Sequence, residues 1–150
     1  MSINIKVASL EDNAQVANLF DLYRQFYKQD SDLDGAASFI YQRLMKKDST
    51  IFLATSEESE LGFLQVYPTF SSISMANVWL INDLYVCSRA RGQGVAKQLL
   101  QQCVEQAEQL QVKLIRISTE FSNTAAAQLY EQFGFEKDTR FQHYNYFLKG

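Results

Sequence analysis

The chain has 150 residues, of which 47% are hydrophobic and 21% are charged, with one Pro and six Gly. This composition predicts one globular domain over residues 1–150 and argues against disorder and low complexity. The net charge of −3 argues against a nucleic-acid partner, because a phosphate backbone needs a basic surface. No stretch approaches the roughly 20 apolar residues of a membrane span, so no membrane partner is expected.

The hydrophobic pattern predicts the element order β-α-α-β-β-β-α-β-α-β-β. Alternating apolar residues mark the strands, and apolar residues three or four positions apart mark the helices. The first six elements are a strand at 3–7, helices at 12–28 and 37–44, and strands at 50–54, 61–67 and 78–87. A helix from Gly94, a strand at 114–117, a helix at 123–133 and two closing strands at 135–139 and 141–148 follow. A hairpin-built half joined to a βαβ half predicts an α+β, or mixed α/β, fold around a central, mostly antiparallel sheet.

The two cysteines bear on metal binding and on location. Cys87 and Cys103 have no His nearby and do not form a metal-binding motif, so no metal site is expected. Cys103 falls on the apolar face of a predicted helix, which indicates a buried structural thiol. Because residues 1–10 also lack the apolar core of a secretory signal, a reducing, cytoplasmic location is predicted.

The segment from Arg89 to Gly94 lies where the central strand ends and a long helix begins. Gly92 and Gly94 let the backbone approach a ligand and adopt conformations that other residues avoid. The free N–H groups of the helix's first turn favour an anion, and Arg89 and Arg91 add positive charge suited to a diphosphate. A Lys stands where a dinucleotide fingerprint needs its third Gly, and no Gly-Lys-Ser/Thr completes a P-loop. A plain strand-to-helix turn is the alternative interpretation of this segment.

A second pattern lies further along the chain, where Asn123 precedes a helix that carries Tyr130 and ends at Gly134. For this helix alone, a capping Asn and a half-buried Tyr are the simplest interpretation. Together, Arg89-x-x-Gly92-x-Gly94 and Asn123-x-x-Ala126-x-x-x-Tyr130-x-x-x-Gly134-Phe135 resemble the two motifs of the GNAT superfamily of N-acetyltransferases. The resemblance covers essentially the whole chain, and residues 61–63 and 81–87 are further similar to its diamine acetyltransferase branch.

The resemblance implies a GNAT fold, acetyl-coenzyme A as the acetyl donor and no metal. The pantetheine arm of the donor would pair with the backbone of Leu84, Tyr85 and Val86, as another strand would. Its pyrophosphate would be held by the backbone of Gly92, Gln93, Gly94, Val95, Ala96 and Lys97, beside Arg89 and Arg91. Asn123 would contact the cofactor arm, and Tyr130 would lie beside the thioester sulfur and protonate the departing thiolate.

The acceptor side departs from the diamine branch at two positions. An alkyl amine is mostly protonated at neutral pH, so a base or a water relay should remove a proton before attack. The branch usually has Glu where this chain has Asn82, which does not titrate and is expected to be a polar contact. Asp83 would point to the opposite face of a regular strand, as a structural carboxylate, unless a bulge redirects it. The branch also has an acidic residue near Tyr27, so Phe26, Tyr27 and Asn82 are the candidate substrate residues, and a primary amine other than a polyamine is favoured.

The sequence therefore predicts an acetyltransferase that acts on a primary amine, either a small metabolite or a lysine-like side chain, by direct attack. Protein or peptide N-acetylation is the alternative among enzymes. A non-catalytic coenzyme A sensor or interaction module is the alternative outside them, and the missing Glu motivates it. The aromatic residues of 141–147 are consistent with a homodimer interface, since relatives commonly pair through their C-terminal strands, and equally with the core of a monomer.

Overall fold

The computed structural model describes residues 2–57 and 59–150. The chain forms two compact units, Met1–Ser118 and Thr119–Gly150. The expectation of a single domain over residues 1–150 stays a prediction.

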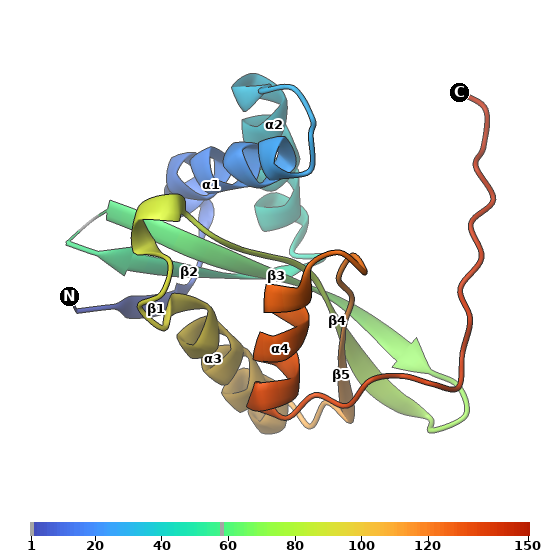
Figure 1. Cartoon of the computed structure of the whole chain (residues 1–150). Coiled ribbons are helices and arrows are strands. Elements are labelled where there is room, and N and C mark those ends of the chain that lie inside the picture. Colours follow the sequence, from blue (N-terminus) through green and yellow to red (C-terminus); the bar gives the residue numbers. More distant parts are fainter. Residues whose placement is uncertain (1, 58) are drawn as a thin grey trace. The chain divides into compact units, whose positions relative to one another are not determined.

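The first unit is a five-stranded sheet with helices on both faces (Figure 1). Its elements are β1 (Asn4–Val7), η1 (Leu10–Asp12), α1 (Asn13–Phe26), α2 (Leu33–Lys46), β2 (Thr50–Ser56), β3 (Ser59–Ser71), β4 (Ala76–Val86), η2 (Ser88–Ala90), α3 (Val95–Gln109) and β5 (Leu114–Ile117). The helices α1 and α2 lie on one face of the sheet, and α3 lies on the other (Figure 1).

The strands lie side by side in chain order, β1 to β5. Neighbours are antiparallel except β4 and β5, which are parallel because α3 carries the chain back before β5 begins. The expected mixed, mostly antiparallel sheet is confirmed. The second helix begins at Leu33, earlier than predicted, because the Asp32 side chain accepts a hydrogen bond from the Gly35 N–H at 3.0 Å and caps the helix.

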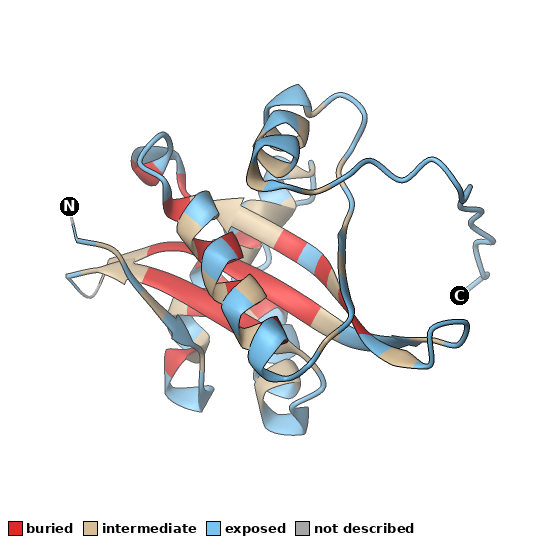
Figure 2. Ribbon diagram, turned by 90° about the horizontal axis from the view of Figure 1, so that it is seen from below, coloured by how far each residue is buried: buried red, intermediate tan, exposed pale blue. Residues whose placement is uncertain are grey.

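The core fills the space between the sheet and its helices, and Figure 2 shows buried residues, in red, along the central strands. Phe52 and Phe63 are fully buried on β2 and β3, and Leu99 and Leu100 are fully buried on α3. The predicted apolar stripe of α3 is confirmed. Cys103 lies within it, and burial raises the pKa of its thiol to about 12, so the thiol stays protonated and acts as a core side chain.

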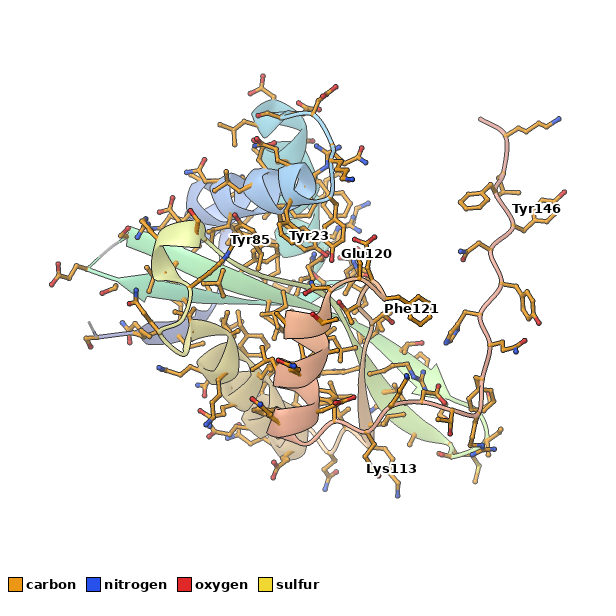
Figure 3. The ribbon with its side chains drawn as sticks, in the orientation of Figure 1. Tyr23, Tyr85, Lys113, Glu120, Phe121 and Tyr146 are labelled. Carbon is orange, nitrogen blue, oxygen red and sulfur yellow. The ribbon has the colours of Figure 1, made fainter. Side chains whose placement is uncertain are left out.

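The second unit contains α4 (Thr124–Phe133) and an extended C-terminal segment, residues 135–150. The two predicted closing strands are wrong, because this segment forms no strand. Its aromatic residues are exposed, Tyr144 by 86% and Tyr146 by 89% (Figure 3). Alternating aromatic residues indicate strand propensity, but a strand also needs a backbone to pair with, and the described residues provide none for this segment.

Candidate active site

The second half of β4 has an unpaired edge. β3 pairs with one side of β4 as far as Val86, whereas β5 pairs with the other side only from Val78 to Ile81. From Asn82 to Val86, no strand among the described residues lies along the β5 side. Of the three residues predicted to bind an amide-bearing ligand arm, Leu84 and Val86 direct their backbone groups to this open side and can pair with an added extended group, whereas those of Tyr85 face Phe63 on β3.

The glycine turn follows directly on this edge. Gly92 and Gly94 have φ angles of 76° and 81°, the left-handed region that the sequence predicted for them. An added Cβ at either glycine would meet nothing within 4 Å, so the turn is open on its outer side. Gly94 is the N-cap of α3 and no side chain caps that end of the helix, which leaves the first N–H groups, those of Val95, Ala96 and Lys97, for an anion.

The two arginines of the turn lie in different places. The Arg89 Nη2 donates hydrogen bonds to the Ser59 Oγ and to the Glu60 carbonyl, both at 2.7 Å. Gln93 Nε2 in turn donates to the Arg89 carbonyl at 3.3 Å. Arg89 and Gln93 therefore tie the turn to the start of β3 and fix its position, whereas the guanidinium of Arg91 is exposed at the end of β4.

A β-bulge in β4 rearranges the acceptor side. Gln65 pairs with Asp83 and the next residue, Val66, pairs with Ile81, so Asn82 is the extra residue. The Asn82 Nδ2 donates to the Asp83 Oδ1 at 3.0 Å, which brings the two neighbouring side chains together. The expectation for a regular strand, with the two side chains on opposite faces, is wrong because of this bulge.

Asp83 is the buried end of a hydrogen-bonded chain. Its side chain is 4% exposed, and its Oδ2 accepts from the Gln65 Nε2 at 2.7 Å. The Gln65 Oε1 accepts from the Ser49 Oγ at 2.8 Å. Burial raises the pKa of Asp83, and hydrogen bonds from Gln65, Tyr23 and Asn82 oppose that rise. The predicted hydrogen bonding of this carboxylate is confirmed, and a raised pKa beside the exposed Asn82 also suits a proton acceptor.

Aromatic rings from α1, β3 and β4 gather beside this hydrogen-bonded chain. The Tyr23 ring lies edge-on to Tyr27, Phe63 and Tyr85, with centroids 5.2, 5.7 and 6.1 Å away. The Phe26 ring lies edge-on to Tyr27 at 5.4 Å. Figure 3 shows Tyr23 and Tyr85 close to each other where α1 covers the sheet. The predicted substrate residues Phe26, Tyr27 and Asn82 thus come from the end of α1 and from the bulge.

Sequence reasoning missed Tyr23 and Gln65. The Tyr23 hydroxyl donates to the Asn82 carbonyl at 3.3 Å, and Gln65 is fully buried. Both left a signal in the sequence. Tyr23 lies one helical turn before Tyr27 and therefore on the same face of α1. Gln65 interrupts an otherwise apolar run in β3, and a polar residue buried in a central strand needs a partner.

Asn123 and Tyr130 lie in the second unit. The Asn123 Oδ1 accepts from the Ala126 N–H at 3.1 Å, which confirms the predicted helix cap. Tyr130 is half-buried, with the Phe135 ring edge-on at 5.9 Å. Glu120 is exposed in the loop before α4 (Figure 3). The roles of these residues toward a ligand stay predictions.

The described residues form neither a metal site nor a membrane-spanning helix. In residues 2–57 and 59–150, no three His, Cys, Asp or Glu side chains gather as metal ligands would. Within the same ranges, no helix has the length and apolar character needed to cross a membrane.

Comparisons with known proteins agree on one family. Residues 16–135 match the model of the Acetyltransferase (GNAT) family. The chain is 44% identical over 142 residues to an uncharacterized N-acetyltransferase, YhfO, of Bacillus subtilis (strain 168), covering 95% of each chain. It is 34% identical over 74 residues to a probable acetyltransferase of Haemophilus influenzae, covering 49% of this chain and 51% of that protein.

Solved structures show the same fold. The crystal structure of a probable acetyltransferase is similar with a TM-score of 0.90 and 39% identity, covering 100% of this chain and 99% of that one. An aminoglycoside acetyltransferase from a soil metagenome, solved with sisomicin, has a TM-score of 0.81 at 18% identity, covering 98% of this chain and 97% of that one. At that identity the likeness concerns the fold alone.

Proposed function

Because the chain belongs to the GNAT family of acetyltransferases, we propose that it moves an acetyl group from acetyl-coenzyme A to a primary amine, with no metal. The observation that carries this proposal is the continuous path formed by the unpaired edge of Asn82–Val86, the open glycine turn and the uncapped start of α3. An amide-bearing arm fits the edge, and a diphosphate fits the helix terminus.

The residues divide the binding work along that path. The backbone of Leu84 and Val86 would hold the arm, and an N–H of the same strand would face the oxygen on which negative charge develops. The N–H groups of residues 92–97 would hold the pyrophosphate. Arg91, whose Nε donates to the Val86 carbonyl at 3.0 Å, is exposed and can turn toward that charge.

Acetyl-coenzyme A supplies the thioester, and side chains of the protein would handle the protons. Asp83, with its raised pKa, would accept the proton of the amine directly or through a water, and the bulge at Asn82 is what makes this role available. Tyr130 would donate a proton to the departing thiolate. Since phenol and thiol pKa values differ by only about 1.5 units, that transfer is slightly uphill and depends on positioning.

One experiment separates this function from a coenzyme A sensor. Purified protein is titrated with acetyl-coenzyme A by calorimetry, and thiol release is then followed with a panel of primary amines and a lysine-containing peptide. Binding together with amine-dependent thiol release is the expected result. Binding without acceleration by any acceptor would favour the sensor, and a preference for the peptide would favour protein N-acetylation. Absence of binding would refute the assignment of the donor.

The assembly and location are separate proposals. We propose a homodimer because Phe141, Tyr144, Tyr146 and Phe147 expose between 55% and 89% of their surface, more than a stable monomer usually shows in one segment. Sedimentation as a monomer at all concentrations tested would refute it. The free, buried thiols Cys87 and Cys103 support the proposed cytoplasmic location.

A further inference from the structure

The aromatic cluster at the end of α1 and the buried Asp83 carboxyl meet at one residue, Tyr23. Its ring touches Tyr27 and Tyr85, and its hydroxyl bonds to the Asn82 carbonyl and contributes to the hydrogen bonding of Asp83. Tyr23, Tyr27 and Tyr85 are half-buried and Phe26 is exposed, so this cluster borders solvent, unlike the core beneath it. Aromatic surface and one carboxyl group therefore lie side by side.

The cluster already holds a cation. The guanidinium carbon of Arg91 lies 5.9 Å from the Phe26 ring centroid and 5.7 Å from the Tyr85 ring centroid. Both distances are within the range at which a ring face attracts positive charge. A ligand ammonium would find the same attraction, while its carbon skeleton would pack on the rings.

The charges around the cluster favour a ligand with a single positive group. Asp21, a buried carboxylate on α1, accepts hydrogen bonds from the Asp32 N–H, Ser31 and Gln25, so it holds the α1–α2 loop. Among the described residues, Asp83 is thus the buried carboxyl that is hydrogen-bonded to a ring of the cluster, that of Tyr23. A second ammonium would lack a comparable partner at the cluster, which penalises polyamines and aminoglycosides.

We propose that the acceptor is a monocationic primary amine with an aromatic body, such as an arylalkylamine, bound with its amino group toward Asp83 and its body on the rings of Phe26, Tyr27 and Tyr85. This inference rests on the proposed acetyltransferase function and adds the class of acceptor. It also gives the aromatic residues of α1 a function in place of the acidic residue that the diamine branch has near Tyr27.

The first test is a substrate panel with the full chain and saturating acetyl-coenzyme A. The probes are 2-phenylethylamine, hexylamine, spermidine and sisomicin, and kcat/KM is measured by thiol release. Because an aromatic contact is worth about 0.5–1.5 kcal/mol, 2-phenylethylamine should exceed hexylamine by about two- to tenfold, and should exceed spermidine and sisomicin by more. A preference for spermidine or sisomicin would overturn the inference and leave the acetyltransferase function standing.

The second test replaces one aromatic ring by an aliphatic side chain. Phe26→Leu should raise the KM for 2-phenylethylamine about two- to fivefold, as expected for a partly exposed cation–π or ring contact, with little change for hexylamine. Phe70→Leu is the matched control, since Phe70 is exposed by 79% on the β3–β4 hairpin. Equal KM values for Phe26→Leu and Phe70→Leu would overturn the placement of the acceptor.

Calorimetry with coenzyme A and 2-phenylethylamine provides a readout that does not depend on turnover. Binding of this amine that weakens in Phe26→Leu supports the inference even if no amine is acetylated, an outcome that would refute the proposed function alone. Failure of 2-phenylethylamine to bind, with another amine acetylated, would refute the inference alone.

Discussion

Replacing Asp83 by Asn should separate its part in the reaction from its part in the fold. Both carboxylate oxygens accept from amides, Oδ1 from Asn82 at 3.0 Å and Oδ2 from Gln65 at 2.7 Å. In Asp83→Asn, the new NH2 group would face the NH2 of Gln65. A half-turn of the Gln65 amide removes that clash, because its Oε1 then accepts from the new amide and its Nε2 donates to Ser49. The Ser49 hydroxyl makes this possible, since it can accept as well as donate.

The expected magnitudes follow from this arrangement. Hydrogen bonds to a charged group are worth about 1 kcal/mol more than neutral ones, but the neutral amide escapes the cost of burying a charge, so the unfolding free energy should change by less than about 1 kcal/mol. Asp83→Leu, in contrast, leaves the buried Gln65 Nε2 without an acceptor and should cost about 1–3 kcal/mol. Loss of a general base should lower kcat about 10²- to 10⁴-fold in Asp83→Asn.

Urea unfolding followed by the fluorescence of Trp79, the single and buried Trp of β4, measures the stability term. Ser49→Ala should cost about 1 kcal/mol more in the Asp83→Asn background than in the wild type, because the turned Gln65 amide then lacks its acceptor. Additive costs would refute the rearrangement. A kcat for Asp83→Asn within threefold of wild type at pH 7 would refute the role as base.

The same substitution has a signature in pH. Burial raises the pKa of Asp83, so the folded chain binds this proton more tightly than the unfolded chain does. The associated stability is complete below the ordinary carboxyl pKa of about 4 and is lost as pH rises through the folded pKa. Asp83→Asn has no carboxyl to ionise and does not lose stability in this way. Its unfolding free energy should therefore rise relative to that of the wild type between pH 4 and pH 7. An unchanged difference across that interval would argue that Asp83 titrates normally.

Three further predictions concern other parts of the chain. Gly94→Ala, at a φ of 81°, should cost about 1 kcal/mol of stability and weaken acetyl-coenzyme A binding in calorimetry; unchanged binding would show that the turn does not hold the donor. Hydrogen bonding from the Asp32 N–H lowers the pKa of Asp21, so the stability that this carboxylate contributes is present above pH 4 and is lost on acidification. In Asp21→Asn, the free energy of unfolding by urea should therefore fall less below pH 4 than in the wild type. An equal fall in both proteins would contradict this. Tyr130→Phe should lower kcat while acetyl-coenzyme A affinity is retained, and an unchanged kcat would remove its role as acid.

Local signals in the sequence were enough for the parts of the site that depend on one segment. Gly94 before an apolar stripe located the start of α3, and Asn123 and Gly134 located both ends of α4. The unpaired edge of β4 leads into the turn at Gly92 and Gly94 because the turn follows β4 in the sequence. These features depend on helix caps and backbone freedom, which a few neighbouring residues determine.

Features that depend on partners were beyond the same reasoning. The bulge at Asn82 comes from the pairing of Gln65 with Asp83 across two strands, and strand register is a property of both. The aromatic segment after α4 has strand-forming residues, yet pairing with another strand decides whether it becomes one. The sequence alone likewise does not show that the buried Gln65 contacts Asp83, because that contact depends on how β3 and β4 are aligned.

An unpaired strand edge also invites aggregation, because any other extended chain can bind where the ligand should. Here the unpaired stretch is short, from Asn82 to Val86, with a bulge at one end and a 3-10 turn soon after the other. Both interrupt a regular ladder of backbone hydrogen bonds, so a strand of another protein could form only a few such bonds along β4. The interruptions that shape the proposed donor path would therefore also protect the protein from aggregation whenever that path is empty.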